Sequence, residues 1–143
     1  MFRQRPYWPA ILVAALASFL FEAAWFTLFL KQWLAGTGHT MAWLVHSMPY
    51  PPAVQYATAL ACSIIVGIAL SILIQMTGPQ TARRGALMGA LIWAGILAPA
   101  YAKDYIFAVR TLEFYAINVG YTLFDLMLIG AIVGGWKSRK RLL

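Results

Sequence analysis

The chain has 143 residues, of which 62% are hydrophobic and only 10% are charged. Soluble domains average roughly 45–50% apolar and about 25% charged residues. A water-soluble fold of this size could not hide so much apolar surface, because small domains leave a large share of their surface exposed. Disorder is excluded too, since it requires low hydrophobicity and high charge. The composition therefore indicates an integral membrane protein.

The charge balance is basic, with eleven Lys and Arg against four Asp and Glu and a net charge of +7. The basic residues flank apolar runs, as topology signals and contacts with lipid headgroups do. A nucleic-acid interface would instead need a basic patch on a soluble core. We therefore expect the lipid bilayer as the partner, and no nucleic acid. A single cysteine, Cys62, excludes an intrachain disulfide.

Four apolar stretches approach the length of about 20 residues that a membrane-spanning helix needs. The predicted spans are residues 9–30, 53–75, 85–101 and 112–136, within a single transmembrane domain that covers 1–143. The expected fold class is all-α, a polytopic four-transmembrane-helix bundle. The N-terminal run also resembles a cleavable signal peptide. It continues past Ala17 to Leu30, however, so we expect a retained first span.

The distribution of Lys and Arg predicts how the spans are oriented. Eight of these residues lie in the N-terminal segment, the second connector and the C-terminal tail, against three in the first and third connectors. Both termini are therefore expected to be cytoplasmic. The basic residues expected to contact anionic lipid on that side are Arg83, Arg84, Lys137, Arg139, Lys140 and Arg141.

The connector at residues 31–52 is the longest, and it is predicted to contain a short amphipathic helix on the outer membrane surface. The apolar residues with helical spacing there are Met41, Leu44, Val45 and Met48. Thr40 could cap this helix. An alternative role for the segment is a lid over the outer mouth of the bundle. The residues assigned to this outer connector and interface are Trp33, Trp43, His39 and His46.

Small residues at four-residue spacing are expected to bring the helices together, because lipid gives apolar helices no hydrophobic reason to associate. They are Ser63, Gly67 and Ser71 in the second span, Gly85 and Gly89 in the third, and Gly130 and Gly134 in the fourth. These rows favour a compact bundle, and they could equally serve self-association into a homo-oligomer.

Two carboxyl groups fall inside the predicted spans, where an ionisable group is costly and marks a candidate functional site. Glu22 lies about 20 Å beyond Pro9, and Asp125 lies about 16 Å before Trp136, at a helical rise of about 1.5 Å per residue. Both should lie near the membrane midplane, where they could meet across a helix pair. No Lys or Arg lies at that depth in any predicted span, so at least one carboxyl is expected to be protonated at neutral pH.

Aromatic and polar residues accompany the two carboxyls at helical spacing. Those that follow Glu22 are Trp25, Phe26, Phe29 and Trp33, and those that precede Asp125 are Asn118, Tyr121 and Thr122. The predicted midplane site comprises Glu22, Asp125, Asn118, Tyr121 and Trp25. Aromatic rings beside a carboxylate suit a cationic ligand. The leading hypothesis is therefore binding or translocation of a proton, a small cation or a hydrophobic cation.

Three other interpretations stay open from the sequence. The carboxyls could be protonated groups that only hydrogen-bond two helices together. The chain could be a non-catalytic accessory subunit of a larger membrane complex. It could also be a lipid-modifying enzyme that works at the outer interface.

Several familiar motifs are missing from the chain. It has no Gly-rich phosphate loop, no Gly-x-Ser-x-Gly and no Cys-x-x-Cys. His39 and His46 could share one face of the interfacial helix, but without a nearby carboxylate they make a poor metal site. We therefore expect no catalytic residue, no metal and no cofactor. The sequence favours a non-enzymatic protein over an enzyme.

Two stretches carry a family resemblance. One is Trp25-Phe26-x-x-Phe29-x-Lys31-x-Trp33, and the other is Ile117-Asn118-Val119-Gly120-Tyr121-Thr122-Leu123 followed by Gly130 and Gly134-Gly135-Trp136. Both resemble a family of small four-span bacterial membrane proteins, domain of unknown function 1761. The resemblance implies a multi-pass protein of the bacterial cytoplasmic (inner) membrane, and it implies no activity.

Overall fold

The computed structural model describes residues 6–78 and 81–136. In this part of the chain the structure is helical and has no strand. The basic tail residues expected to contact anionic lipid (Lys137, Arg139, Lys140 and Arg141) lie outside the described residues.

The helices are α1 (Trp8–Leu28), α2 (Leu30–Thr37), α3 (Met41–Ser47), α4 (Pro52–Met76), α5 (Ala82–Ile92), the π-helical segment η1 (Trp93–Leu97), α6 (Ala98–Phe107) and α7 (Leu112–Gly135). Four of the described helices are long and apolar enough to cross a membrane: α1, α4, the continuous α5–η1–α6 segment and α7. The predicted fold class, an all-α protein with four potential membrane spans, is confirmed.

The first long helix bends at Phe29, inside the range that was predicted as one span. Its backbone leaves helical geometry there (φ −101°, ψ 16°), and α2 continues directly beyond it. Trp33, which was expected in the outer connector, therefore belongs to a helix that packs on the bundle. Its ring contacts the rings of Phe26 and Phe114. An apolar run does not reveal a bend within it, so the sequence did not indicate that this part of the connector forms a helix against the bundle.

The third long helix extends to Phe107, beyond the predicted end at residue 101. Pro99 lies within it and has no backbone N–H to donate, so an ordinary α-helix would be broken at this point. The chain widens into the π-helical segment η1 immediately before the proline. A π-turn accommodates such a local defect without ending the helix, and this is why the helix continues.

The short helix α3 forms where the amphipathic segment was expected. Thr40 caps it, because its side chain accepts a hydrogen bond from the backbone N–H of Trp43 at 3.2 Å. His39 lies before the helix and stacks on the Trp43 ring, with ring centroids 3.6 Å apart. His46 lies inside the helix and is exposed. Because His39 lies outside α3, the two histidines do not share a face of this helix.

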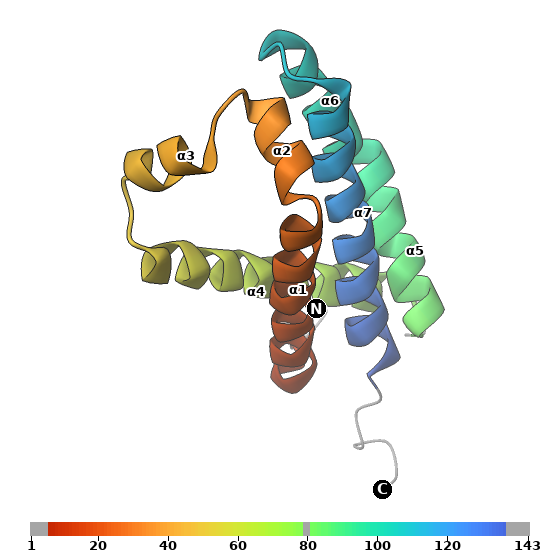
Figure 1. The fold of residues 1–143 in the computed structure, drawn as a ribbon. Helices are drawn as coiled ribbons and strands as arrows, with labels where there is room; N and C mark the ends of the chain where they lie inside the picture. The colour runs from red at the N-terminus through yellow and green to blue at the C-terminus, as the bar shows by residue number, and fades with distance from the viewer. Residues whose placement is uncertain (1–5, 79–80, 137–143) are drawn as a thin grey trace, which may run out of the picture.

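The long helices do not all run side by side. In Figure 1, α1, α5 and α7 run roughly along one another, α4 runs across them, and α3 lies to one side between α2 and α4. The rings of Tyr7, just before α1, and Trp136, just after α7, lie 6.4 Å apart. The two ends of the described chain therefore lie at the same end of the bundle.

Helices α5 and α7 approach through their glycines. A Cβ at Gly85 would overlap the backbone carbonyl of Gly130, and a Cβ at Gly89 would overlap that of Leu126. Gly134 lies against Thr81 and Gly85 in the same seam. Backbone contact of this kind is how small residues hold helices together in lipid, as expected for these two rows.

Helices α1 and α4 meet through the other row of small residues. Gly67 lies against Ile11, and the hydroxyls of Ser18 and Ser63 are hydrogen-bonded at 3.0 Å in a buried position. A core shared by α1, α4 and α7 lies beside this contact: Ala14, Leu70, Ile74, Leu126, Ile129 and Val133. The helices are therefore tightly joined toward the end of the bundle that holds both termini.

We predict that Gly130→Ala lowers the free energy of unfolding in detergent by about 1–3 kcal/mol, the usual cost of overpacking a tight site. The added methyl would overlap the backbone of Gly85 and push α5 away from α7. Gly95→Ala is the matched control, because nothing lies within 4 Å of a Cβ there. Thermal unfolding followed by circular dichroism measures both variants. Equal melting temperatures would contradict a close backbone contact between α5 and α7 at Gly130.

Candidate functional site: an aromatic cavity at Glu22

A cavity of about 390 Å³ lies between the C-terminal half of α1, α2 and the first turns of α4. Its lining residues are Phe19, Glu22, Ala23, Phe26, Leu30, Trp33, Gln55, Tyr56, Ala59 and Asn118. Its volume falls in the range of about 300–1,000 Å³ that is typical of small-molecule sites. The lining is mostly aromatic and aliphatic, with a few polar groups.

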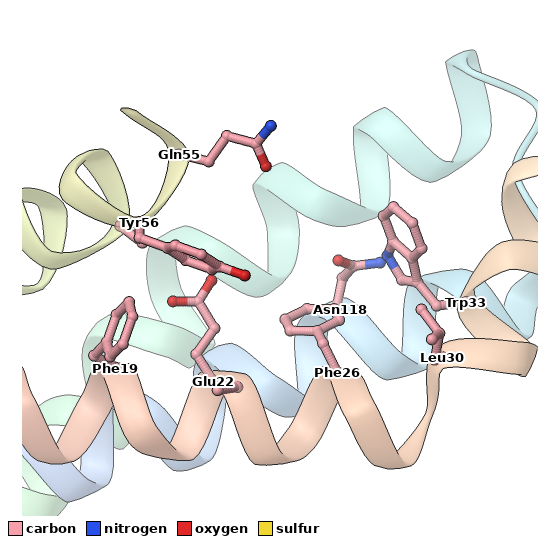
Figure 2. A pocket seen from close by; sticks show the side chains of 10 residues that line it. Phe19, Glu22, Phe26, Leu30, Trp33, Gln55, Tyr56 and Asn118 are labelled. Atoms are coloured by element: carbon pink, nitrogen blue, oxygen red, sulfur yellow. The ribbon is translucent and has the colours of Figure 1, made fainter. Parts of the chain in front are cut away.

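Glu22 is the acidic side chain of this cavity. Phe19, Glu22 and Phe26 lie three and four residues apart, so one face of α1 presents all three. In Figure 2 the Glu22 carboxyl extends between the two phenyl rings toward Tyr56 of α4. The rings of Phe19 and Tyr56 meet edge to face, with centroids 6.0 Å apart. The carboxyl is thus surrounded by three aromatic rings.

The start of α4 supplies a wall that sequence reasoning did not include. Tyr56 is 62% exposed, so the cavity opens to the outside of the bundle beside it. Gln55 closes the rim, since its amide Nε2 donates to the Tyr50 carbonyl and to Met48 Sδ, each at 2.9 Å. The available signal was a glutamine and a tyrosine one turn inside an otherwise apolar span. Nothing in the pattern, however, paired that turn with Glu22.

The polar residues of α7 are divided between the cavity and the helix interface behind it. Asn118 lines the cavity, and its Nδ2 donates to the Phe114 carbonyl at 2.8 Å. Tyr121 is not among the lining residues. It stacks on Phe21, with centroids 5.8 Å apart, and its hydroxyl lies beside the Glu22 carboxyl. Tyr121 therefore supports the cavity from behind.

Asp125 also lies behind the cavity. Its carboxyl neighbours the hydroxyls of Ser18 and Tyr121, and it interacts electrostatically with Glu22. Its Oδ1 is buried, with no hydrogen-bond partner among the described residues. The two carboxyls therefore belong to one polar cluster between α1 and α7, but only Glu22 lines the cavity.

Trp25 lies on another face of α1, away from the cavity lining. Its indole Nε1 donates to the Ile117 carbonyl at 3.2 Å, and its ring covers Gly120. Phe29, expected on the same stripe as Glu22, packs on Trp25 with ring centroids 4.8 Å apart. The structure thus assigns Trp25 to the contact between α1 and α7, while Phe26 and Trp33 remain with Glu22.

The expected surface residues lie elsewhere in the fold. Arg83 and Arg84 are exposed in the first turn of α5, which Thr81 caps by accepting a hydrogen bond from the Arg84 N–H at 3.1 Å. Within residues 6–78 and 81–136, no group of three His, Cys, Asp or Glu side chains could hold a metal ion. The groups available at the cavity are therefore the Glu22 carboxyl, the Tyr56 hydroxyl, the amides of Gln55 and Asn118, and the faces of the aromatic rings.

Comparison with known proteins identifies the family. The model for the family described as "Protein of unknown function (DUF1761)" matches residues 9–134. The chain belongs to the DUF1761 family. No curated protein and no solved structure matches it. In this DUF1761 member every residue that lines the cavity lies inside the matched range.

We predict that Trp25→Phe lowers the free energy of unfolding of this DUF1761 member by about 0.5–1.5 kcal/mol, the net value of one hydrogen bond. The phenyl ring keeps an aromatic contact but loses the donor to the Ile117 carbonyl. Trp8→Phe is the control, because Trp8 is 52% exposed at the start of α1. Denaturant unfolding of both variants measures the difference. An equal effect of the two would argue against a stabilising hydrogen bond from Trp25 to Ile117.

Proposed function

We propose that this protein binds a hydrophobic organic cation in the cavity, with the cationic group beside Glu22. The observation that carries the proposal is the Glu22 carboxyl, which lies among the rings of Phe19, Phe26 and Tyr56 in a cavity of about 390 Å³. No lysine or arginine lines this cavity. A cationic ligand would supply the positive charge that the carboxyl otherwise lacks.

Aromatic rings favour an organic cation over a hydrated inorganic ion. A cation over a ring face gains about 0.5–2 kcal/mol, and more where water is excluded. Ca²⁺ and Mg²⁺ instead require about six oxygen ligands. The side chains that line the cavity offer five oxygens: two from Glu22 and one each from Gln55, Tyr56 and Asn118. The lining therefore suits a quaternary ammonium or a similar apolar cation.

A proton and the cation compete for Glu22 in this proposal. A protonated carboxyl is neutral and loses its attraction for a cation, so binding of the cation requires the ionised form. Each binding event on a protonated site would release one proton. Asp125 lies in the same polar cluster, and its charge state would influence this exchange. A cycle of this kind is what a cation–proton exchanger needs.

The test is binding of octyltrimethylammonium to the full chain in lipid nanodiscs, measured by isothermal titration calorimetry against empty nanodiscs. We expect Glu22→Gln to weaken binding by at least about tenfold, the effect of losing a charge-assisted contact of about 1.5 kcal/mol or more. Binding to the wild type should weaken as the pH falls, because protons compete for the carboxyl.

Glu113→Gln is the matched control for this experiment. It removes the same type of charge from an exposed position in the first turn of α7, outside the cavity. Affinity should then stay within about twofold of the wild type, as for surface substitutions that touch no structural feature. Equal affinity of wild type and Glu22→Gln, or equal losses in both variants, would contradict binding at Glu22.

We also infer that both termini are cytoplasmic in a bacterial inner membrane. The charge distribution supports this orientation, and the contact between Tyr7 and Trp136 supports placing both ends on one side. A C-terminal fusion to green fluorescent protein, expressed in bacteria, should be fluorescent, and a fusion to alkaline phosphatase should be inactive. An active phosphatase fusion would show that the C-terminus lies outside the cytoplasm and would contradict the inferred orientation.

A further inference from the structure

We infer that Asp125 is a proton-holding group of the cation site: when a cation occupies the cavity, Glu22 is ionised and one proton stays on the Asp125 carboxyl behind it. The inference rests on the proposed function, since it assigns the protons that accompany the same ligand. It starts from the cluster of Glu22, Asp125, Ser18 and Tyr121 between α1 and α7. As a consequence, the site presents a single negative charge to the cation.

The register between α1 and α7 brings these four groups together. Three contacts show that the two helices run in opposite directions: Tyr7 with Trp136, Phe21 with Tyr121, and Trp25 with the Ile117 carbonyl. In this register Ser18 lies beside Asp125, and Glu22 lies beside Tyr121. Each helix supplies its two groups from positions four residues apart, which share one helix face. The cluster is therefore a square with two corners on each helix.

The serine hydroxyls leave Asp125 without a hydrogen-bond donor from α1. Ser63 Oγ donates its only hydrogen to the Ala59 carbonyl at 3.2 Å, because a carbonyl can only accept. In the 3.0 Å hydrogen bond between the two serines, Ser18 is then the donor and Ser63 the acceptor. Ser18 therefore has no hydrogen left for Asp125, and its oxygen can only accept a hydrogen bond from that carboxyl.

Tyr121 is the remaining hydroxyl of the cluster, and it has one hydrogen for two carboxyls. A Tyr121 hydroxyl that donates to an ionised Glu22 can only accept from Asp125, which must then carry a proton. A neutral Asp125 completes a row of hydrogen bonds in which Asp125 donates to Tyr121 and Tyr121 donates to Glu22. Two ionised carboxylates would instead compete for the single hydrogen of Tyr121.

Burial decides which of the two carboxyls keeps the proton. Asp125 Oδ1 is buried and has no hydrogen-bond partner among the described residues, so a negative charge there would be neither hydrated nor bonded. Glu22 lines the cavity, where a cation or water can reach its carboxyl. An ionised Glu22 beside a neutral Asp125 is therefore the less costly arrangement, and a cation beside Glu22 favours it further.

The surroundings of the pair offer no cation of their own within the described residues. The titratable groups that face Glu22 are three tyrosines and one carboxyl: Tyr56 of α4, Tyr101 of α6, and Tyr121 and Asp125 of α7. Those that face Asp125 are Glu22 and Tyr121. Helix α4 contains no charged residue. The arginines of α5 lie in its first turn, against Gly134, which is about 14 Å from Asp125 at the helical rise.

This arrangement fixes the stoichiometry of the proposed exchange. When both carboxyls are protonated, an entering cation displaces the proton of Glu22. The O–H bond of Glu22 breaks, its electron pair stays on the carboxylate, and the proton passes to water. Asp125 keeps its own proton. One monovalent cation is therefore exchanged for one proton, and the net charge of the site does not change.

The test is infrared spectroscopy of the full chain with octyltrimethylammonium bound at neutral pH, in a maltoside detergent, which has no carbonyl group. Only a protonated carboxyl gives the C=O stretch of a carboxylic acid. We expect such a band in the wild type, and we expect it to shift when aspartate carries a heavy carbon isotope in its side-chain carboxyl. Asp125→Asn should lose the band. Asp104→Asn, the matched control at an exposed position, should keep it.

The pH dependence of affinity is a second readout, which a purely structural role of Asp125 would not move. As the pH rises, wild-type affinity for octyltrimethylammonium should increase in two steps, one for each carboxyl that ionises. Asp125→Asn should keep only the lower step, which belongs to Glu22. At neutral pH this variant should lose less than the roughly tenfold expected for removal of a charge that contacts the cation, because Asn is neutral like a protonated Asp.

The possible outcomes separate this inference from the proposed function. If the wild type does not bind octyltrimethylammonium, the proposed function fails. If it binds but shows no isotope-sensitive band, or if Asp125→Asn keeps the band or both pH steps, the role of Asp125 is overturned while cation binding at Glu22 stands. Isotope labelling leaves the sequence unchanged, so the wild type alone decides the question if Asp125→Asn does not fold.

Discussion

Lipid offers this chain no hydrophobic force to hold helix against helix, so the fold depends on how closely backbones can approach. The contact between Gly85 and Gly130 is the clearest case, because the two helices touch there through backbone atoms. It fixes α5 on α7, and α7 in turn contacts α1, α2, α4 and α6. The α7 helix is therefore the scaffold on which the other elements are positioned.

The cavity results from a change in residue size along α1 and α4. Near the end that holds the termini, Ser63 and Gly67 allow α4 to lie directly on α1. Nearer the start of α4, which runs across α1 (Figure 1), the large rings of Phe19 and Tyr56 meet edge to face. The space between α1 and α4 is the cavity into which Glu22 extends. The same pair of helices thus supplies both tight packing and one wall of a cavity.

Polar groups inside the bundle follow the rule that burial requires a partner, with two exceptions. Ser18, Trp25 and Trp93 all have hydrogen bonds across helices. Trp33 Nε1 and Asp125 Oδ1 do not, within the part of the chain that the structure describes. The ring of Trp33 lines the cavity, and Asp125 belongs to the cluster behind Glu22.

The sequence by itself predicted that most of this protein lies in lipid, and where its four long helices lie along the chain. Composition and hydropathy are summed over many residues, so they predict four long apolar helices reliably, and the four-residue spacing of small side chains marked the seam between α5 and α7. Glu22 could be singled out because a carboxyl in an apolar run is costly wherever the helix points. The family resemblance followed from local motifs of the same kind.

Only the tertiary structure decided which faces meet. Helix rotation and bending are set by contacts between distant residues, and periodicity does not contain them. The bend at Phe29 leads into α2, which packs Trp33 against Phe114 of α7, while the rotation of α1 turned Trp25 toward α7 and Glu22 toward α4. The partner surface of Glu22 is accordingly made by Tyr56, because long-range packing, and not spacing along one helix, determines what lies opposite a side chain.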